Sequence, residues 1–229
     1  MEELERQGKK IPEDVAVTGY DNSLYARQGQ GITTITYPQE NWEINAYPVN
    51  EIAEYVQDVS QGDIDVLVEE YYNKYDMILD GRDPEEFKEH VAVQAGIEIG
   101  FERFLEEKKY QAIVTHFGDL GSLEQLPGLA IQRLMEKGYG FGGEGDWKTA
   151  AMVRLMKIMT TGKKDAKGTS FMEDYTYNLV PGKEGILEAH MLEVCPTIAD
   201  GPISIKVNPL SMGAVSYTHL RAHETRHDL

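Results

Sequence analysis

The chain has 229 residues, 41% of them hydrophobic and 27% charged, a composition typical of a globular protein with one large or two small cores. No apolar run approaches the roughly 18–20 residues that cross a bilayer, and residues 1–10 lack the apolar stretch of a secretory signal, so membrane insertion and export are not expected. The net charge of −17 opposes binding to nucleic acid, which needs clustered Lys and Arg. The single cysteine, Cys195, cannot form an intrachain disulfide, which agrees with a cytoplasmic location.

Three helices are predicted from residue 50 onward. Asn50 and Asp63 are candidate caps for the first two, because apolar residues follow each at helical spacing. Asp83, followed by a proline and two glutamates, is a start signal for a longer third helix. The apolar stripe of this third helix comprises Phe87, Val91, Ala95, Ile99 and Phe104.

The next segment predicts a strand, a loop and a helix. Residues 110–114 have the composition of a buried strand, and a loop at 115–119 follows. Ser122 and Gln125 form a capping-box pattern for a helix ending near Gly138. This order is typical of a doubly wound α/β sheet, in which ligands bind beyond the carboxyl ends of the strands. The sequence therefore predicts an α/β fold with a Rossmann-like central domain.

A glycine-rich stretch follows at residues 138–145. It matches the dinucleotide-binding pattern G-x-G-x-x-G, but a predicted helix precedes it where that motif needs a strand, so we expect a connecting loop. Asp146 is then predicted to cap a helix ending near Gly162. Beyond it, residues 171–179 and 186–194 have the composition of strands.

Three residues are candidates for a metal-dependent site. Glu144 lies between glycines that let the backbone turn its carboxylate into a cavity, although alone it also fits a surface carboxylate. Glu173 is predicted to share a strand face with Tyr175 and Tyr177. His190 lies in an apolar predicted strand, where a core histidine is the alternative. Two carboxylates and an imidazole suit Mn²⁺ or a similar divalent cation, which would polarise the oxygens of an open-chain sugar while a carboxylate moves a proton through an enediol.

Four long runs resemble L-arabinose isomerases, and the similarity extends back to about Asn45. These runs are DLGSLEQLPGLAIQRLM at 119–135, GYGFGGEGDWKTA at 138–150, GTSFMEDYTY at 168–177 and HMLEVCP at 190–196. The resemblance implies a metal-dependent aldose–ketose isomerase that interconverts L-arabinose and L-ribulose. Its implied fold is of the arabinose/fucose isomerase type, with a central α/β domain at 43–165 and the beginning of a β-rich C-terminal region at 166–213.

The resemblance also implies roles for individual residues. Glu144 and Glu173 correspond to the paired glutamates that bind the metal and transfer the proton, and His190 corresponds to a metal ligand. Phe117 corresponds to a position lining the sugar site, with loop packing as its alternative. The implied cofactor is Mn²⁺ or a similar divalent cation, the substrate is a pentose sugar, and the family is homo-oligomeric.

The resemblance covers only part of the family enzyme, which has further N-terminal and C-terminal domains. The C-terminal domain brings an additional metal-binding histidine, which His219, His223 and His227 do not match. We therefore expect this chain to be an isomerase fragment that is inactive alone.

Both ends differ from the isomerase pattern. Within residues 1–42, the runs KIPEDVAVTGYDN and GITTITYPQ resemble the sugar-sensing domain of LacI-type regulators, so a regulator fragment without enzymatic activity is the alternative function. The tail at 214–229 contains VSYTHLRAHET, which is similar to a translated sequencing-adapter sequence. We expect this tail to be irregular.

Overall fold

The computed structural model describes residues 18–20, 33–35, 42–116, 118, 120–163, 168–190, 192–209 and 216–222. The chain forms two compact units, Met1–Asn45 and Ala46–Leu229. In the first unit, strands β1 (Thr18–Tyr20) and β2 (Thr33–Ile35) pair in parallel. The rest of the regulator-like segment, up to residue 41, lies outside the described residues.

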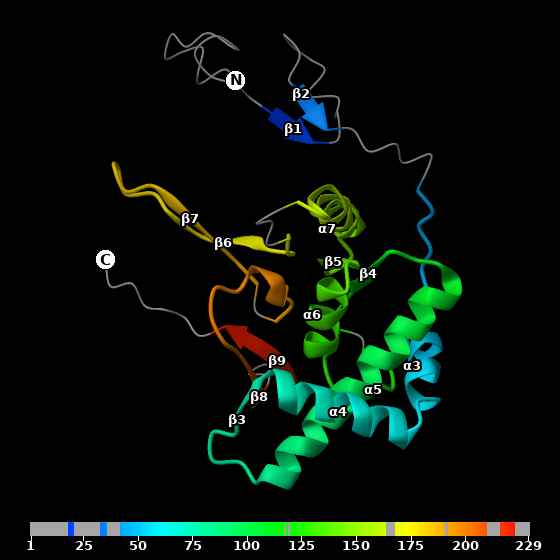
Figure 1. The fold of residues 1–229 in the computed structure, drawn as a ribbon. Helices are drawn as coiled ribbons and strands as arrows, with labels where there is room; N and C mark the ends of the chain where they lie inside the picture. The colour runs from blue at the N-terminus through cyan, green and yellow to red at the C-terminus, as the bar shows by residue number, and fades with distance from the viewer. Residues whose placement is uncertain are drawn as a thin grey trace, which may run out of the picture. The chain divides into compact units, whose positions relative to one another are not determined.

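The second unit begins with helices α3 (Val49–Gln57), α4 (Gln61–Lys74) and α5 (Pro84–Lys108) (Figure 1). The predicted cap of α5 is confirmed, since Asp83 Oδ1 accepts the backbone N–H groups of Glu85 at 2.9 Å and Glu86 at 3.2 Å.

The predicted caps of α3 and α4 are wrong. Asn50 lies inside α3, and its Oδ1 accepts the N–H of Ser122 at 3.0 Å instead. Ser60 caps α4 by accepting the N–H of Asp63 at 3.2 Å, so Asp63 lies in the first turn, where its negative charge favours the helix N-terminus.

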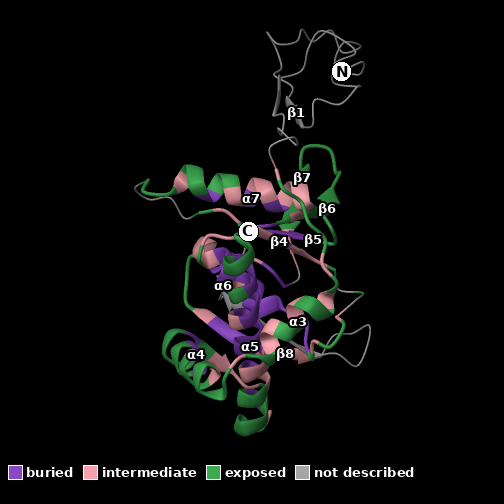
Figure 2. Cartoon of the chain, turned by 90° about the vertical axis from the view of Figure 1, so that its right-hand side faces the viewer, coloured by how far each residue is buried: buried purple, intermediate pink, exposed green. Residues whose placement is uncertain are grey.

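Helix α5 spans the hydrophobic core. Phe87, Val91, Ala95 and Phe104 are buried as predicted, whereas Ile99 is only half-buried. The N-terminal half of α5 packs in one apolar cluster with Tyr71 and Ile205, and its C-terminal half packs in a second with α6 and the strands beside it. Figure 2 shows these buried segments in α5 and α6. No helix within the described ranges is long and apolar enough to cross a membrane.

Strands β4 (Ala112–Thr115) and β5 (Gly140–Gly143) are parallel, and helices α6 (Gly128–Glu136) and α7 (Trp147–Thr160) follow them in the chain. This is the predicted α/β arrangement. The predicted loop at 138–145 is wrong for its central half, Gly140–Gly143, which forms β5.

The glycines of β5 let α7 lie directly against the strand. A Cβ atom on Gly140 would come within 2.1 Å of the carbonyl oxygen of Ala150, and one on Gly142 within 2.2 Å of that of Asp146. A glycine inside a strand often marks such a close backbone approach. Judging the stretch only as a dinucleotide-binding motif therefore does not reveal the strand.

The predicted capping box before α6 is also wrong. The helix begins at Gly128, after Pro127, without a side-chain cap. Gln125 is buried and hydrogen-bonds Gln94 and His90, while the N–H of Ser122 is taken by Asn50. Contacts with other helices thus replace the local cap.

The remaining strands form two further sheets. β6 (Glu173–Asn178) and β7 (Gly185–Ala189) make an antiparallel hairpin, and β8 (Ile203–Pro209) pairs in parallel with β3 (Asp76–Ile78). The predicted second strand at 186–194 is shorter than expected, because β7 ends at Ala189. A 3₁₀ turn, η2 (Pro196–Ile198), follows further along the chain.

The tail prediction is wrong for Ser216–Ala222. These residues form β9, antiparallel to β8. An unpaired edge of β8 offers backbone donors and acceptors to any β-prone segment, and the Ser-Tyr-Thr run supplies such residues.

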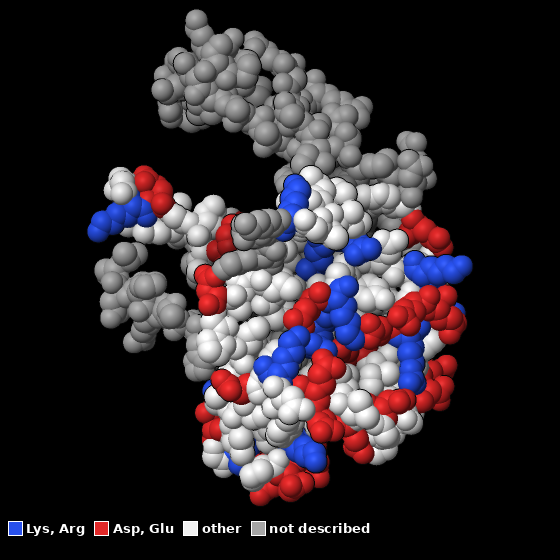
Figure 3. Space-filling view, viewed as in Figure 1, with Lys and Arg blue, Asp and Glu red and all other residues white. Residues whose placement is uncertain are grey.

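An ionic network joins α4, α5 and α6. Arg133, almost fully buried, contacts Glu98 of α5 through Nε at 3.3 Å and Glu136 through Nη1 at 2.9 Å. Lys137 Nζ lies 2.8 Å from Glu98 Oε1 and forms an ion pair with it. Tyr71 donates to the other Glu98 oxygen, and burial, together with the Glu98 charge, raises the pKa of Tyr71 well above its usual value. On the outer face of these helices, acidic and basic side chains lie next to one another (Figure 3).

Candidate metal and sugar site

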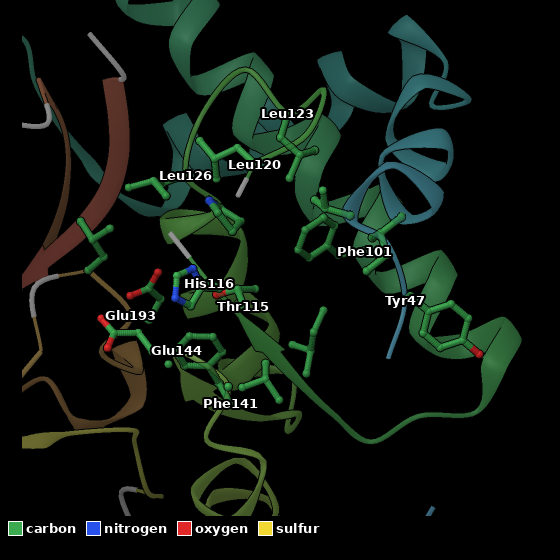
Figure 4. Close-up of a pocket in the computed structure, with 18 of the residues that line it drawn as sticks. Tyr47, Phe101, Thr115, His116, Leu120, Leu123, Leu126, Phe141, Glu144 and Glu193 are labelled. Carbon is green, nitrogen blue, oxygen red and sulfur yellow. The ribbon is translucent and has the colours of Figure 1, made fainter. Parts of the chain in front are cut away.

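A pocket of about 530 Å³ opens beyond the carboxyl ends of β4 and β5. This is the position at which doubly wound folds bind ligands. Glu144 and Glu193 lie at one end of the pocket and Tyr47 at the other (Figure 4). The polar lining comprises Thr115, His116, Glu144, His190 and Glu193, and the apolar lining includes Tyr47, Ile52, Phe101, Leu120, Leu123 and Leu126.

Glu144 is held in the turn between β5 and α7. Its N–H donates to the carbonyl of Thr115 at 2.8 Å, which extends the β4–β5 pairing by one residue. Its φ of 54° is uncommon for a residue with a side chain, and Gly145 follows with φ 90°. Asp146 then caps α7 by accepting the N–H of Thr149 at 3.0 Å, as predicted. The turn places Glu144 on the pocket wall, as its flanking glycines predict.

His190 lies directly after β7, not within a strand as predicted. Its ring meets Phe171 edge-to-face, with centroids 4.7 Å apart, and Phe171 meets Phe141 of β5 in the same way at 5.3 Å. This aromatic stack fixes the ring against the end of β5. A Cβ on Gly143 would lie 3.7 Å from His190 Nε2, so the strand end and the imidazole are in direct proximity.

Both nitrogens of His190 face carboxylates. Nε2 is 3.4 Å from Glu173 Oε1, and Nδ1 is 2.9 Å from Glu193 Oε2. Burial alone would lower the pKa of His190, but the hydrogen bond to Glu193 and the charges of Glu193, Glu173 and Glu144 raise it above its usual value.

The predicted face shared by Glu173, Tyr175 and Tyr177 is interrupted. Glu173 pairs with Ala189, whereas Tyr177 pairs with Ile186, and a register shift lies between Asp174 and Thr176. Ala189 and Ile186 are three residues apart and therefore point to opposite faces of β7. A bulge that adds one residue thus separates Glu173 from Tyr177.

The structure brings two of the predicted ligands into contact and a third to the same pocket. Glu173 and His190 face each other, and Glu144 lines the pocket with His190. Within the described ranges, no group of three or more His, Cys, Asp or Glu side chains is close enough to form a metal site by itself. Phe117 lies outside the described residues.

The donor set nevertheless fits a first-row divalent cation. Two ligand atoms about 2.1 Å from one ion lie roughly 3.0–3.4 Å apart in octahedral or tetrahedral geometry, and His190 Nε2 and Glu173 Oε1 are 3.4 Å apart. A carboxylate on the other ring nitrogen, here Glu193, is the usual partner of a metal-binding histidine.

Sequence reasoning missed Glu193 and His116. The His-x-x-Glu spacing of residues 190 and 193 was visible, but only the turn after β7 brings the two side chains together. His116 follows β4 directly, at the strand end where ligands are expected.

Comparison with known proteins gives two family matches. The family model for the L-arabinose isomerase central domain matches residues 31–162, and that for the L-arabinose isomerase C-terminal domain matches residues 168–220. The first match begins within the regulator-like segment, and the second ends within the adapter-like tail.

Individual relatives agree. The chain is 53% identical to the L-arabinose isomerase of Geobacillus stearothermophilus and 54% identical to that of Anoxybacillus flavithermus, in each case over 76% of this chain and 34% of the relative. It is 47% identical to the L-arabinose isomerase of Serratia proteamaculans over 76% of this chain and 35% of the relative. The chain thus spans about a third of the length of these curated relatives. These matches show that the chain belongs to the L-arabinose isomerase family.

Proposed function

We propose that this chain is part of a metal-dependent aldose–ketose isomerase that interconverts L-arabinose and L-ribulose. The observation that supports it best is the contact between Glu173 and His190 beside the pocket that Glu144 lines. The relatives named as L-arabinose isomerases support the choice of substrate, a pentose sugar.

Glu144, Glu173 and His190 are the proposed metal ligands in this part of the enzyme. A bound Mn²⁺ or similar divalent cation supplies polarisation of the carbonyl and hydroxyl oxygens of the open-chain sugar. Glu144 and Glu173 move the proton between the two adjacent carbons of the sugar. A carboxylate can take the proton from one carbon as a general base and return it to the other as a general acid. Phe117 is the proposed sugar contact, on the loop after β4.

The walls of the pocket hold the sugar away from bulk water. Tyr47, Phe101 and Leu123 line the wall remote from Glu144 and limit the water that reaches the reacting carbons. We further propose a cytoplasmic, homo-oligomeric enzyme whose remaining ligand comes from parts beyond this chain.

Glu173→Gln tests the function in the full-length protein that contains this sequence. We expect Mn²⁺-dependent formation of L-ribulose to fall at least about 100-fold, because the amide neither ionises nor accepts the proton. The matched control is Glu188→Gln, an exposed carboxylate on β7, which should retain wild-type turnover.

Retained turnover in Glu173→Gln would remove Glu173 from the catalytic role. Absence of any L-arabinose conversion by the wild-type full-length protein, with Mn²⁺ present, would contradict the function itself.

A further inference from the structure

We propose that Glu193 is a positioning residue that holds the His190 ring with Nδ1 protonated, so that Nε2 is left facing Glu173 and the cation site. This inference rests on the proposed function, because it assigns a role to a side chain beside the metal ligands. Glu193 is not itself placed as a ligand, since it contacts the opposite nitrogen of the ring.

The burial of Glu193 requires a partner. Its side chain is 7% exposed, while that of Glu173, across the ring, is 42% exposed. A buried carboxylate without a donor is strongly unfavourable. Within the described part of the chain, His190 is the ion-pair partner recorded for Glu193, at 2.9 Å.

Two arrangements of the ring proton compete at Nδ1. The backbone N–H of Glu193 lies 3.3 Å from Nδ1 and would donate to it if that nitrogen carried a lone pair. The Glu193 carboxylate lies at 2.9 Å and can only accept a hydrogen bond when ionised. A lone pair on Nδ1 would then face a negatively charged oxygen at the shorter distance. The charge-assisted bond is the stronger of the two, so Nδ1 carries the proton.

The ring has little freedom to adopt another orientation. Phe171 packs against the ring in an edge-to-face contact, and Gly143 lies close to Nε2. Glu193 follows three residues after His190, so the same short turn sets both side chains. Glu193 therefore determines which nitrogen is available to a cation.

The protonation pattern can be measured without a metal. We would record long-range ¹H–¹⁵N spectra of the metal-free 229-residue chain at a pH where His190 is neutral, assigning its signals with His190→Gln. The expected pattern is a protonated Nδ1 and an unprotonated Nε2. A proton on Nε2 with a free Nδ1 would overturn the proposal.

The second measurement is Mn²⁺ affinity in the full-length protein, by calorimetry. Glu193→Gln should weaken Mn²⁺ binding by about 10–100-fold, the usual effect of losing a carboxylate behind a ligand histidine. The melting temperature of the metal-free protein should change little, because the amide keeps the size of the side chain and loses only the charge that holds the proton on Nδ1. Glu188→Gln is again the matched control and should leave the affinity unchanged.

The outcomes separate this role from a structural one. Unchanged Mn²⁺ affinity in Glu193→Gln would overturn the proposal, as would a loss of affinity that merely parallels unfolding of the metal-free protein. A wild-type protein that binds no Mn²⁺ would contradict the proposed function, and the protonated nitrogen of His190 would still decide whether Glu193 orients the ring.

Discussion

At the scale of single residues, the position of Glu144 depends on how closely α7 approaches β5. Gly142→Ala would place a Cβ 2.2 Å from the Asp146 carbonyl oxygen and 3.0 Å from the Ala150 nitrogen, both backbone atoms. We expect destabilisation by about 1–3 kcal/mol, the usual cost of overpacking, measured as a lower urea midpoint. Gly185→Ala is the control, because a Cβ there meets nothing within 4 Å. Equal midpoints for the two variants would show that α7 can move away from β5 at no cost.

Residue-scale reasoning from the sequence succeeded where the signal was local. The glycines around Glu144 and the cap at Asp146 follow from adjacent residues, and the structure contains both features. Glu193 was missed because its importance comes from the direction of the His190 ring, which no spacing pattern specifies.

At the scale of elements, the three helices α4, α5 and α6 are joined through a buried charge. Arg133→Met would leave Glu98, which is fully buried, without its guanidinium partner. We expect a loss of about 3 kcal/mol in the free energy of unfolding, because the buried Glu98 then keeps only Lys137 and Tyr71 as partners. Arg103→Met, which breaks the exposed pair with Asp63 at 2.8 Å, should cost at most about 1 kcal/mol. Similar losses in both variants, measured by urea unfolding, would argue against the network.

The start of an element could be predicted only when its cap was local. Asp83 supplies its own helix with a cap, so the start of α5 was predicted correctly. Asn50 and Gln125 instead bond to distant segments, which left α3 and α6 without the predicted caps. The sequence does not reveal strand β5, because its glycines are needed for the close approach of α7. That requirement is a contact between two elements and leaves no local pattern.

At the scale of the whole molecule, the chain exposes an apolar hairpin. Tyr177, Leu179, Val180, Ile186 and Leu187 of the β6–β7 hairpin are all more than half exposed (Figure 2). Exposed apolar side chains gathered on one hairpin promote association. We expect this 229-residue chain to self-associate with rising concentration in light-scattering measurements, and Leu179→Lys with Ile186→Lys to reduce that association. Val66→Lys, at a single exposed position on α4, should not. An equal effect of Val66→Lys would place the association elsewhere.

The bulge in β6 sets which face of the hairpin Glu173 occupies. Because successive strand residues point to opposite faces, adding or removing one residue there would turn Glu173 to the other face. One extra residue between Asp174 and Thr176 exchanges the two faces of the hairpin, so Glu173 sits beside His190 while the outer half of the hairpin keeps its own orientation. Changes of length at the hairpin tip, around residues 179–184, lie beyond this exchange and leave Glu173 where it is. Deleting a single residue at the bulge would instead turn one side of the hairpin over. Insertions and deletions during evolution are therefore expected to accumulate at the tip and to avoid the bulge.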